Sequence, residues 1–491
     1  MSTPSTATPE PVTGAQKEGL FHQLTSLSRP FWMVNIMEMF ERLAYYGVRV
    51  VIPIYIAQAD EVGGLHFSQI DKGIIFLWWA VVQSLTPMFS GGFADRYGFK
   101  KTIAFSITLK IVGYLLMATQ REFWPFLFGC CVLALGTAIF KPGVQGTMCR
   151  VLTKKNSSVG WGTFYMLVNV GGFLGPPLAH FLYGWSWPTV FYGCAVIVSL
   201  NFLMLLTYKE VSAGGVQTGG PLKILKITAR NFMNLRLVIF IVIMSGFWLM
   251  FMQLFDMLPN FIVDWVDSSK MVADLHLPEF MLQINSTRGP QLSQEWMINS
   301  NPGLIIIAVV FISWIAARMR RVHSICLGIT IASAGLVLAG FTTSGYFCMM
   351  GILVFSVGEM LSSPKMNEYL GVIAPEGQKG LYMGYANVPV AVGWGYGSLL
   401  GGQVYDRMGD KANLALDYLA NHYNIVNISR PQAMNKLMEV TGMNAVDATS
   451  MLWSVYHPYK LWYQFAIIGL VSALGMLLYS RWVRKHKGMN V

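Results

Sequence analysis

The stretch EMFERLAYYGVR, from Glu38 to Arg49, places two glutamates and two arginines inside an apolar segment. FWMVNIM precedes it and VVIPIYIA follows it, a composition typical of a membrane span. On a helical wheel, Glu38, Glu41, Arg42, Tyr45 and Arg49 fall within an arc of roughly 100°. A charged side chain at the bilayer centre costs about 2.5–3.5 kcal/mol, so this stripe is expected to face a polar cavity. A buried ion-pair network that only fixes helix packing is the alternative, but the number of ionisable groups favours a pathway for protons or a solute.

The overall composition is that of a protein embedded in a membrane. Of the 491 residues, 54% are hydrophobic and only 12% are charged, whereas a soluble domain carries about 25% charged residues. Apolar runs long enough to cross a bilayer as helices recur along most of the chain. The net charge of +11 could indicate nucleic-acid binding. The basic residues cluster in short loops between apolar runs, however, which indicates membrane orientation instead, so we expect a lipid bilayer and no nucleic acid as partner.

Twelve spans are predicted from these runs, six on either side of a connector. Their approximate limits are 31–57, 70–93, 102–119, 124–149, 160–183, 187–207, 235–264, 301–317, 322–342, 346–373, 380–405 and 458–482. With this count every basic loop falls on one side, which is therefore predicted to be cytoplasmic together with both termini. The predicted fold is an all-α membrane protein with two six-helix bundles, in a plasma or inner membrane. Its segments are a disordered tail at 1–28, bundles at 29–208 and 234–483, a connector at 209–233 and a short tail at 484–491.

Two long segments lie on the side opposite the basic loops, near 265–300 and 406–457. The second segment contains apolar residues at helical spacing, for example in ANLALDYLANHYNI. Short amphipathic helices are expected there. They either lie on the membrane surface or form a small extramembrane unit without a role in transport, and the sequence leaves both interpretations open.

The loop after the second span carries the motif GGFADRYGFKK. It resembles the G-x-x-x-D-[RK]-x-G-[RK]-[RK] signature of the major facilitator superfamily. The resemblance implies a tight cytoplasmic turn that acts as a conformational latch, with Gly91, Asp95, Arg96 and Gly98 as its residues. It also implies a site near the membrane midplane, between two helical repeats.

A more specific resemblance covers residues 30–405. EMFERLAYYG is similar to the E-x-x-E-R-F-x-Y-Y-G signature of the proton-dependent oligopeptide transporter family, with Leu43 where phenylalanine is usual. Five further segments resemble motifs of this family in the same order along the chain: AIFKPGVQG, FYMLVNVGGFLGP, FWLMFMQ, INSNPGLIII and VGEMLSSP.

The resemblance implies a symporter that imports di- and tripeptides with protons by alternating access. Arg42, Arg49 and Lys141 would hold the peptide carboxylate, because arginine can bind a carboxylate through two hydrogen bonds. Glu359 would hold the amino group. The predicted substrate-binding residues are Arg42, Tyr45, Tyr46, Arg49, Lys141, Asn169, Trp248, Asn301 and Glu359. Proton coupling is assigned to Glu38, Glu41 and Arg42, because neighbouring acids oppose each other's ionisation while arginine favours it.

This chain departs from the family pattern at several positions. Met252 stands where an acid usually precedes Gln253, and no tryptophan occurs near Tyr385. Asp256 lies one helical turn beyond Met252 and could replace the missing acid in coupling if it faces the cavity. Otherwise Asp256 would be a water-exposed acid near the extracellular mouth, and Glu38 and Glu41 would carry coupling alone.

Alternative functions remain open. A transporter of the same fold could carry a carboxylate, an amino-acid derivative or a nitrate-like anion, and a membrane sensor could bind without transport. An enzyme is not expected, because the sequence shows no nucleophile–base pair, nucleotide loop or metal-ligand spacing, and its six cysteines form no CxxC pair. No cofactor is expected apart from protons as the coupling ion. The sequence does not define the oligomeric state, and a monomer would suffice for transport.

Overall fold

The computed structural model describes residues 20–87, 94, 96–153, 156–211, 234–283, 286, 288–373 and 385–487. Within these residues the chain is helical and has only two isolated β-bridges. The first bundle contains α1 (Leu20–Thr25), α2 (Arg29–Ala57), α3 (Gln69–Leu85), α5 (Phe99–Thr119), α6 (Phe123–Val151), α7 (Ser157–Tyr183) and α8 (Trp187–Leu206). The second contains α10 (Leu235–Phe251), α11 (Gln253–Asp256), α12 (Leu258–Trp265), α14 (Gln294–Ala317), α15 (Arg321–Gly340), α16 (Gly345–Ile373), α18 (Asn387–Met408) and α22 (Leu461–Lys487).

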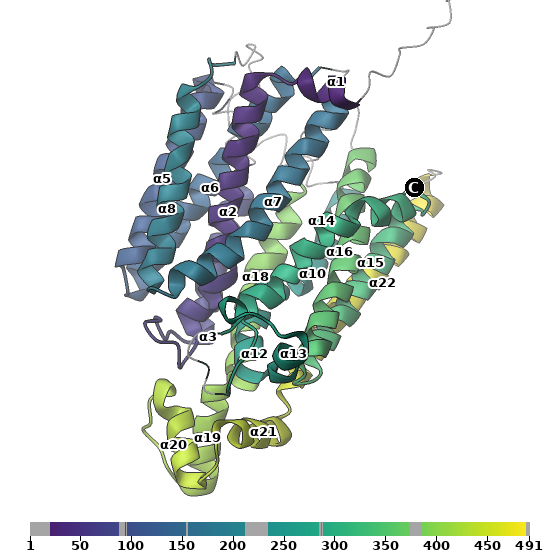
Figure 1. Cartoon of the computed structure of the whole chain (residues 1–491). Coiled ribbons are helices and arrows are strands. Elements are labelled where there is room, and N and C mark those ends of the chain that lie inside the picture. The colour runs from purple at the N-terminus through teal and green to yellow at the C-terminus, as the bar shows by residue number, and fades with distance from the viewer. Residues whose placement is uncertain are drawn as a thin grey trace, which may run out of the picture.

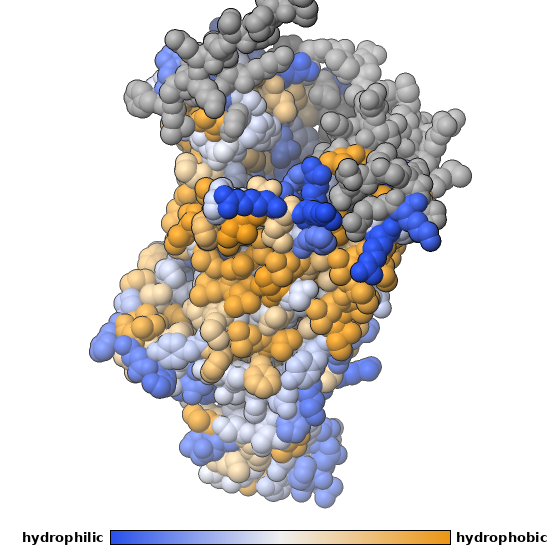
Figure 2. Space-filling view, turned by 90° about the vertical axis from the view of Figure 1, so that its right-hand side faces the viewer, coloured by the Kyte–Doolittle hydropathy of each residue, from blue (hydrophilic) through white to orange (hydrophobic). Residues whose placement is uncertain are grey.

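The two bundles lie side by side, with the first in purple to teal and the second in green to yellow (Figure 1). In the described part of the chain, eight helices are long and apolar enough to cross a membrane. The spanning helices outside that group are α2, α3, α7 and α18. These four helices make the contacts between the bundles, in the pairs α3–α18, α7–α14 and α2–α12. Helices that face a protein interior need fewer apolar residues than helices that face lipid. A band of hydrophobic side chains crosses the middle of the molecule, with hydrophilic residues at both ends (Figure 2).

The seventh predicted span is interrupted rather than continuous. It consists of α10, α11 and α12, with breaks at Met252 and Met257. Pro259 stands at the start of α12 and has no N–H to donate to the carbonyl of Phe255, four residues earlier. Arg49 of α2 approaches this carbonyl instead, with its Nη1 at 3.4 Å. The break therefore frees a backbone acceptor for a side chain of the other bundle.

Close backbone contacts join the bundles along α3 and α18. A Cβ atom on Gly73 would lie 2.6 Å from the carbonyl oxygen of Ser398, and one on Gly402 would lie 2.5 Å from that of Gln69. Both contacts are too short for any side chain larger than hydrogen, since the clashing atoms belong to the backbone. Glycine at these two positions therefore allows α3 and α18 to pack in close contact between the two bundles.

A small helical unit extends beyond the end of the bundles (Figure 1). It comprises α19 (Lys411–Tyr423), η2 (Arg430–Gln432), α20 (Ala433–Thr441) and α21 (Ala445–Tyr456). α13 (Ser269–Leu275) lies at the same end of the molecule, and η1 (Glu279–Met281) follows it in the chain. The three α-helices pack on one another through buried residues such as Leu419 and Leu437. Trp453 of α21 contacts Phe261 and Trp265 of α12, so the unit is attached to the second bundle. We call this end of the molecule the α19 end and the opposite end the α1 end.

Candidate functional site

A cavity of about 430 Å³ lies between the two bundles and is lined by residues of both. This volume is within the range of about 300–1,000 Å³ that small-molecule sites occupy. The cavity lining contains all nine residues predicted to bind substrate: Arg42, Tyr45, Tyr46, Arg49, Lys141, Asn169, Trp248, Asn301 and Glu359. Their roles stay predictions, but the structure brings residues from α2, α6, α7, α10, α14 and α16 to one place.

Charge is distributed unequally between the two walls of the cavity. The charged lining residues of the first bundle are cations, namely Arg42, Arg49 and Lys141. Lys141 is exposed and has no ion-pair partner among the residues that the structure describes. Glu359 is the charged lining residue of the second bundle, and Asn301 donates to its Oε2 at 3.0 Å. A solute with an anionic and a cationic end would therefore find complementary charge on opposite walls.

The charged stripe of α2 does not face the cavity as a whole, so this part of the prediction is wrong. Arg42 and Arg49 line the cavity, whereas Glu38 and Glu41 are buried behind its wall. Glu41 receives hydrogen bonds from Arg42 Nε at 2.5 Å and from Lys110 Nζ of α5 at 2.6 Å. Glu38 Oε1 lies 3.3 Å from Arg42 Nε, and Oε2 of Glu38 is buried and has no hydrogen-bond partner among the described residues. The helical wheel placed these groups on one side but could not show that α5 covers part of it.

Asp256 does not line the cavity, and it is not the water-exposed acid of the alternative, because only 3% of its surface is exposed. It forms an ion pair with Arg49 across the two bundles. Ser398 Oγ donates to its Oδ2 at 2.6 Å, and Trp394 Nε1 donates to the same oxygen at 3.1 Å. The guanidinium of Arg49 also lies 5.2 Å from the centre of the Trp394 ring. Asp256 thus holds a lining cation in place, and the condition set for its coupling role, that it face the cavity, is not met.

The predicted latch is only partly visible, because Gly91 and Asp95 lie outside the described residues. Arg96 is exposed and its guanidinium lies over the ring of Tyr97. Gly98 precedes α5 with a φ angle of 95°, a left-handed conformation that strains any residue with a Cβ atom. Glu210 accepts the backbone N–H of Lys100 at 3.2 Å, so a carboxylate that the sequence did not indicate compensates the N-terminus of α5.

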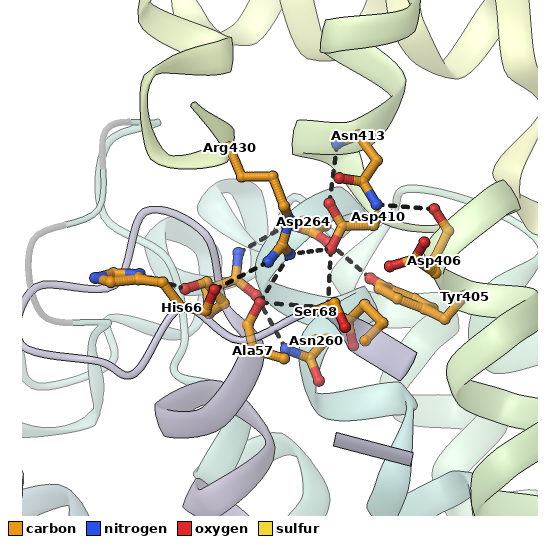
Figure 3. A network of polar contacts seen from close by, with 12 residues as sticks. Ala57, His66, Ser68, Asn260, Asp264, Tyr405, Asp406, Asp410, Asn413 and Arg430 are labelled. Atoms are coloured by element: carbon orange, nitrogen blue, oxygen red, sulfur yellow. Dashed lines mark hydrogen bonds and ion pairs between the residues drawn. The ribbon is translucent and has the colours of Figure 1, made fainter. Parts of the chain in front are cut away.

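A polar network joins the two bundles at the α19 end (Figure 3). Arg430 of the α19–α21 unit donates to two carbonyls of the first bundle, that of Ala57 at 3.0 Å and that of Phe67 at 2.8 Å. It also forms an ion pair with Asp410 at 2.5 Å. Asp410 in turn accepts a hydrogen bond from Gln69 Nε2 of α3 at 2.9 Å. Its side chain also accepts the backbone N–H of Asn413 in the first turn of α19.

A second set of bonds in this network involves α12. Gln58 donates to Asp264 at 2.8 Å and accepts from Asn260 at 3.2 Å, and both partners belong to α12. Lys72 of α3 donates to Asn260 at 2.7 Å, and Tyr405 of α18 donates to Asp264 at 2.7 Å. Most of these bonds cross from one bundle to the other. Opening the α19 end requires that they break together.

Sequence reasoning missed three groups of this site. Lys110 carries a charge inside the apolar run SITLKIVGYLL, a signal of the same kind as the one that identified Lys141. Trp394 lies in the eleventh span, about two helical turns beyond Tyr385, the residue near which the family pattern has a tryptophan. Arg430 lies in a polar segment that resembles many surface loops, so no sequence signal distinguished it.

Comparisons with known proteins agree with this architecture. A family model described as Major Facilitator Superfamily matches residues 34–398. Multidrug resistance protein MdtH of Yersinia enterocolitica is 23% identical over 397 residues, which cover 79% of this chain and 89% of that protein.

Solved structures show the same fold at low sequence identity. The POT family transporter PepTSo has a TM-score of 0.66 at 16% identity and is matched over 94% of this chain and 99% of its own. A POT family transporter in complex with 5-aminolevulinic acid also has a TM-score of 0.66, at 15% identity over 94% of this chain and 99% of its own. These similarities confirm the predicted all-α fold of two six-helix bundles and the resemblance to oligopeptide transporters at the level of fold. The chain is an integral membrane transporter that belongs to the major facilitator superfamily.

Proposed function

We propose that this protein is a proton-coupled symporter that imports di- and tripeptides by alternating access. The observation that carries the proposal is the division of charge in one cavity, with Arg42, Arg49 and Lys141 on one bundle and Glu359 on the other. A peptide zwitterion has a carboxylate and an ammonium at opposite ends of the chain. Such a substrate would bridge the bundles and favour their closure around it, because the interactions are complete only when both walls approach.

The carboxylate end of the peptide would bind at Lys141. This ammonium is exposed in the cavity and lacks an ion-pair partner in the described residues, whereas Arg42 and Arg49 are already paired with acids. The amino end would bind Glu359, which Asn301 orients by donating to one oxygen. Tyr45, Tyr46 and Trp248 would provide walls for peptide side chains of varied size. Recognition would then depend on the two ends of the peptide more than on its sequence.

The α19 end would face the outside and the α1 end the cytoplasm, as the basic loops indicate. The network of Arg430, Asp410, Asn260 and Asp264 would then be the closed outer barrier of an inward-facing state. Import would require this barrier to open while the α1 end closes. We place the protein in a plasma or inner membrane with both termini cytoplasmic, and a monomer would suffice.

Proton coupling would reside in Glu38, Glu41 and Arg42 of α2. These residues lie directly behind the cavity wall, and Arg42 takes part in both the wall and the acid pair. A proton on one of the acids would change the pairing of Arg42 and so the charge that the cavity presents to a carboxylate. Substrate and proton would then affect each other's affinity by the same factor.

Uptake into proteoliposomes tests the proposal. Vesicles containing the purified protein are given a radiolabelled dipeptide with and without an inward proton gradient. We expect accumulation above the external concentration only with the gradient, and competition by other dipeptides and tripeptides. Binding of the dipeptide without uptake would identify a sensor. Failure to bind or transport any dipeptide would refute the proposal.

A second candidate is an amino-acid derivative with one amine and one carboxylate. The same charges at Lys141 and Glu359 would suit such a solute, and one structural neighbour was solved with 5-aminolevulinic acid. Export of drugs, which the name of the curated relative suggests, is less well supported because three lining cations would repel cationic compounds. Unlabelled 5-aminolevulinic acid and a cationic dye should therefore be included as competitors in the uptake experiment.

A further inference from the structure

Lys110 is a buried cation to which the proposed mechanism gives no role. It lies on α5 with none of its surface exposed. Its Nζ is 2.6 Å from Glu41 Oε1 and 3.9 Å from the centre of the Phe140 ring. A Cβ atom on Gly136 of α6 would lie 2.8 Å from Lys110 Cγ, so the glycine leaves room for the lysine stem. The packing of α5 and α6 therefore holds the ammonium in one position against Glu41.

The two glutamates of α2 have unequal surroundings as a result. Both oxygens of Glu41 accept from a cation, one from Lys110 and the other from Arg42. One oxygen of Glu38 lies 3.3 Å from Arg42 Nε. The other oxygen is buried and finds no hydrogen-bond partner in the part of the chain that the structure describes. Burial disfavours the charged form of a carboxyl group, whereas hydrogen bonds from cations favour it. Glu41 therefore has strong support for its charge and Glu38 has little.

We infer that Lys110 is a positioning residue that keeps Glu41 ionised and thereby leaves Glu38 as the carboxylate that takes up the transported proton. This inference rests on the proposed proton-coupled function and assigns the proton to one of the two acids. Lys110 does not line the cavity, so it acts on the substrate only through Glu41 and Arg42.

The charges around Glu38 explain why its protonation would matter to the substrate. Arg42 and Glu41 face it from α2, Lys110 from α5 and Lys141 from α6. Among the described residues, the charges of the other helices that pack on α2 have partners elsewhere. Lys72 of α3 bonds Asn260, Asp256 of α11 pairs with Arg49, Asp264 of α12 bonds Gln58, and Glu295 of α14 lies beside His180 of α7.

Three cations and two ionised acids leave one net positive charge, and a proton on Glu38 leaves two. The additional positive charge favours a substrate carboxylate near Lys141. The bound carboxylate favours the proton in return, because thermodynamic coupling between two ligands is reciprocal.

The inference is tested with four variants in proteoliposomes. Glu38→Gln removes the proposed proton acceptor. The double variant Glu41→Gln/Lys110→Met removes both partners of the Glu41–Lys110 ion pair. Removal of both partners of a buried ion pair destabilises a protein less than removal of one, which leaves an unpaired buried charge. Lys110→Met alone leaves Glu41 without its lysine. Ser106→Ala is the control, because Ser106 bonds the Gly136 carbonyl at the same α5–α6 contact and carries no charge.

Three measurements are made on each variant: accumulation driven by a proton gradient, exchange without a gradient, and the pH at which uptake is half-maximal. We expect Glu38→Gln to lose accumulation and keep exchange. The double variant, in which Glu38 can still take up a proton, should accumulate more substrate than Glu38→Gln. Lys110→Met should shift the half-maximal pH upward by about one unit or more, because a carboxylate that loses an adjacent cation holds its proton to higher pH. Ser106→Ala should leave this pH unchanged. Accumulation in the double variant as low as in Glu38→Gln, or an unshifted half-maximal pH in Lys110→Met, would overturn the inference.

A measurement without substrate separates this inference from the proposed function. Infrared difference spectra between acidic and alkaline pH report the carbonyl stretch of protonated carboxyl groups. Among the bands of all carboxyl groups that titrate in this range, we expect one component that Glu38→Gln removes and the double variant retains, and one additional component in Lys110→Met. If these bands occur but no dipeptide is transported, the proposed substrate is wrong and the role of Lys110 stands. If the band disappears only with Glu41, the role of Lys110 is refuted.

Discussion

Replacement of Arg430 by glutamine should open the α19 end of the molecule. Arg430 donates across the bundles to the carbonyls of Ala57 and Phe67, at 3.0 and 2.8 Å. The carbonyl of Ala57 belongs to the last turn of α2, whose acceptors have no partner within the helix. A hydrogen bond from a charged donor contributes about 1.5–3 kcal/mol, so two contribute about 3–6 kcal/mol. Because the side chain is 16% exposed and glutamine can retain one bond, we expect a net loss of about 2–4 kcal/mol.

A loss of this size changes the ratio of closed to open molecules by about 30- to 1,000-fold, since each 1.4 kcal/mol is a factor of ten. Spin labels can be attached at Val62 and Leu275, which are 71% and 57% exposed. Pulsed electron paramagnetic resonance then measures the distance between the two labels, which reports the separation of the bundles at this end. Cys149 is exposed and must first be replaced by serine so that it does not take up label. We expect one short distance in the parent protein and an additional longer one in Arg430→Gln.

Lys436→Gln is the matched control for this experiment. Lys436 belongs to the same α19–α21 unit and pairs with Glu439 on the surface at 2.9 Å, so its loss removes the same charge without touching the bundle contact. Its distance distribution should match that of the parent. A distribution in Arg430→Gln that is indistinguishable from both would show that the α19–α21 unit does not hold the bundles together, and the reasoning from hydrogen bonds would be refuted.

Three further predictions concern the cavity. Lys141→Ala should reduce uptake of a dipeptide at low concentration at least tenfold, because a hydrogen bond to a charged group contributes about 1.5–3 kcal/mol, whereas unchanged uptake would exclude Lys141 from carboxylate binding. Glu359→Gln should weaken inhibition by free-amine dipeptides more than by N-acetylated ones, and equal loss for both would contradict its role at the amino end. Asp256→Asn should lower the free energy of unfolding by about 3–5 kcal/mol, because it leaves Arg49 buried and unpaired. The double variant Arg49→Gln/Asp256→Asn should restore this free energy. Thermal unfolding in detergent measures this last effect, and a double variant no more stable than Asp256→Asn would show that the ion pair is not its cause.

The sequence alone determined the features that depend on local composition. A run of apolar residues must become a helix in a bilayer because its backbone groups can be satisfied only within the helix. The twelve spans and the break between bundles followed from this rule. An isolated charge in such a run must also face the protein interior. Arg42, Lys141 and Glu359 could therefore be assigned to a cavity before the structure showed it.

Only the tertiary structure decided which charges are paired. Glu41 pairs with Lys110, which lies 69 residues away in the sequence, and Arg49 pairs with Asp256, which lies 207 residues away. Helical periodicity defines the side of a helix on which a residue lies, but not the neighbouring helix that covers it. The same stripe on α2 therefore contains two arginines that line the cavity and two glutamates that are sealed behind it. Ion pairing is decided by helix packing, because electrostatic energy depends on the distance between groups and on their exclusion from water, and neither quantity is a property of the local sequence.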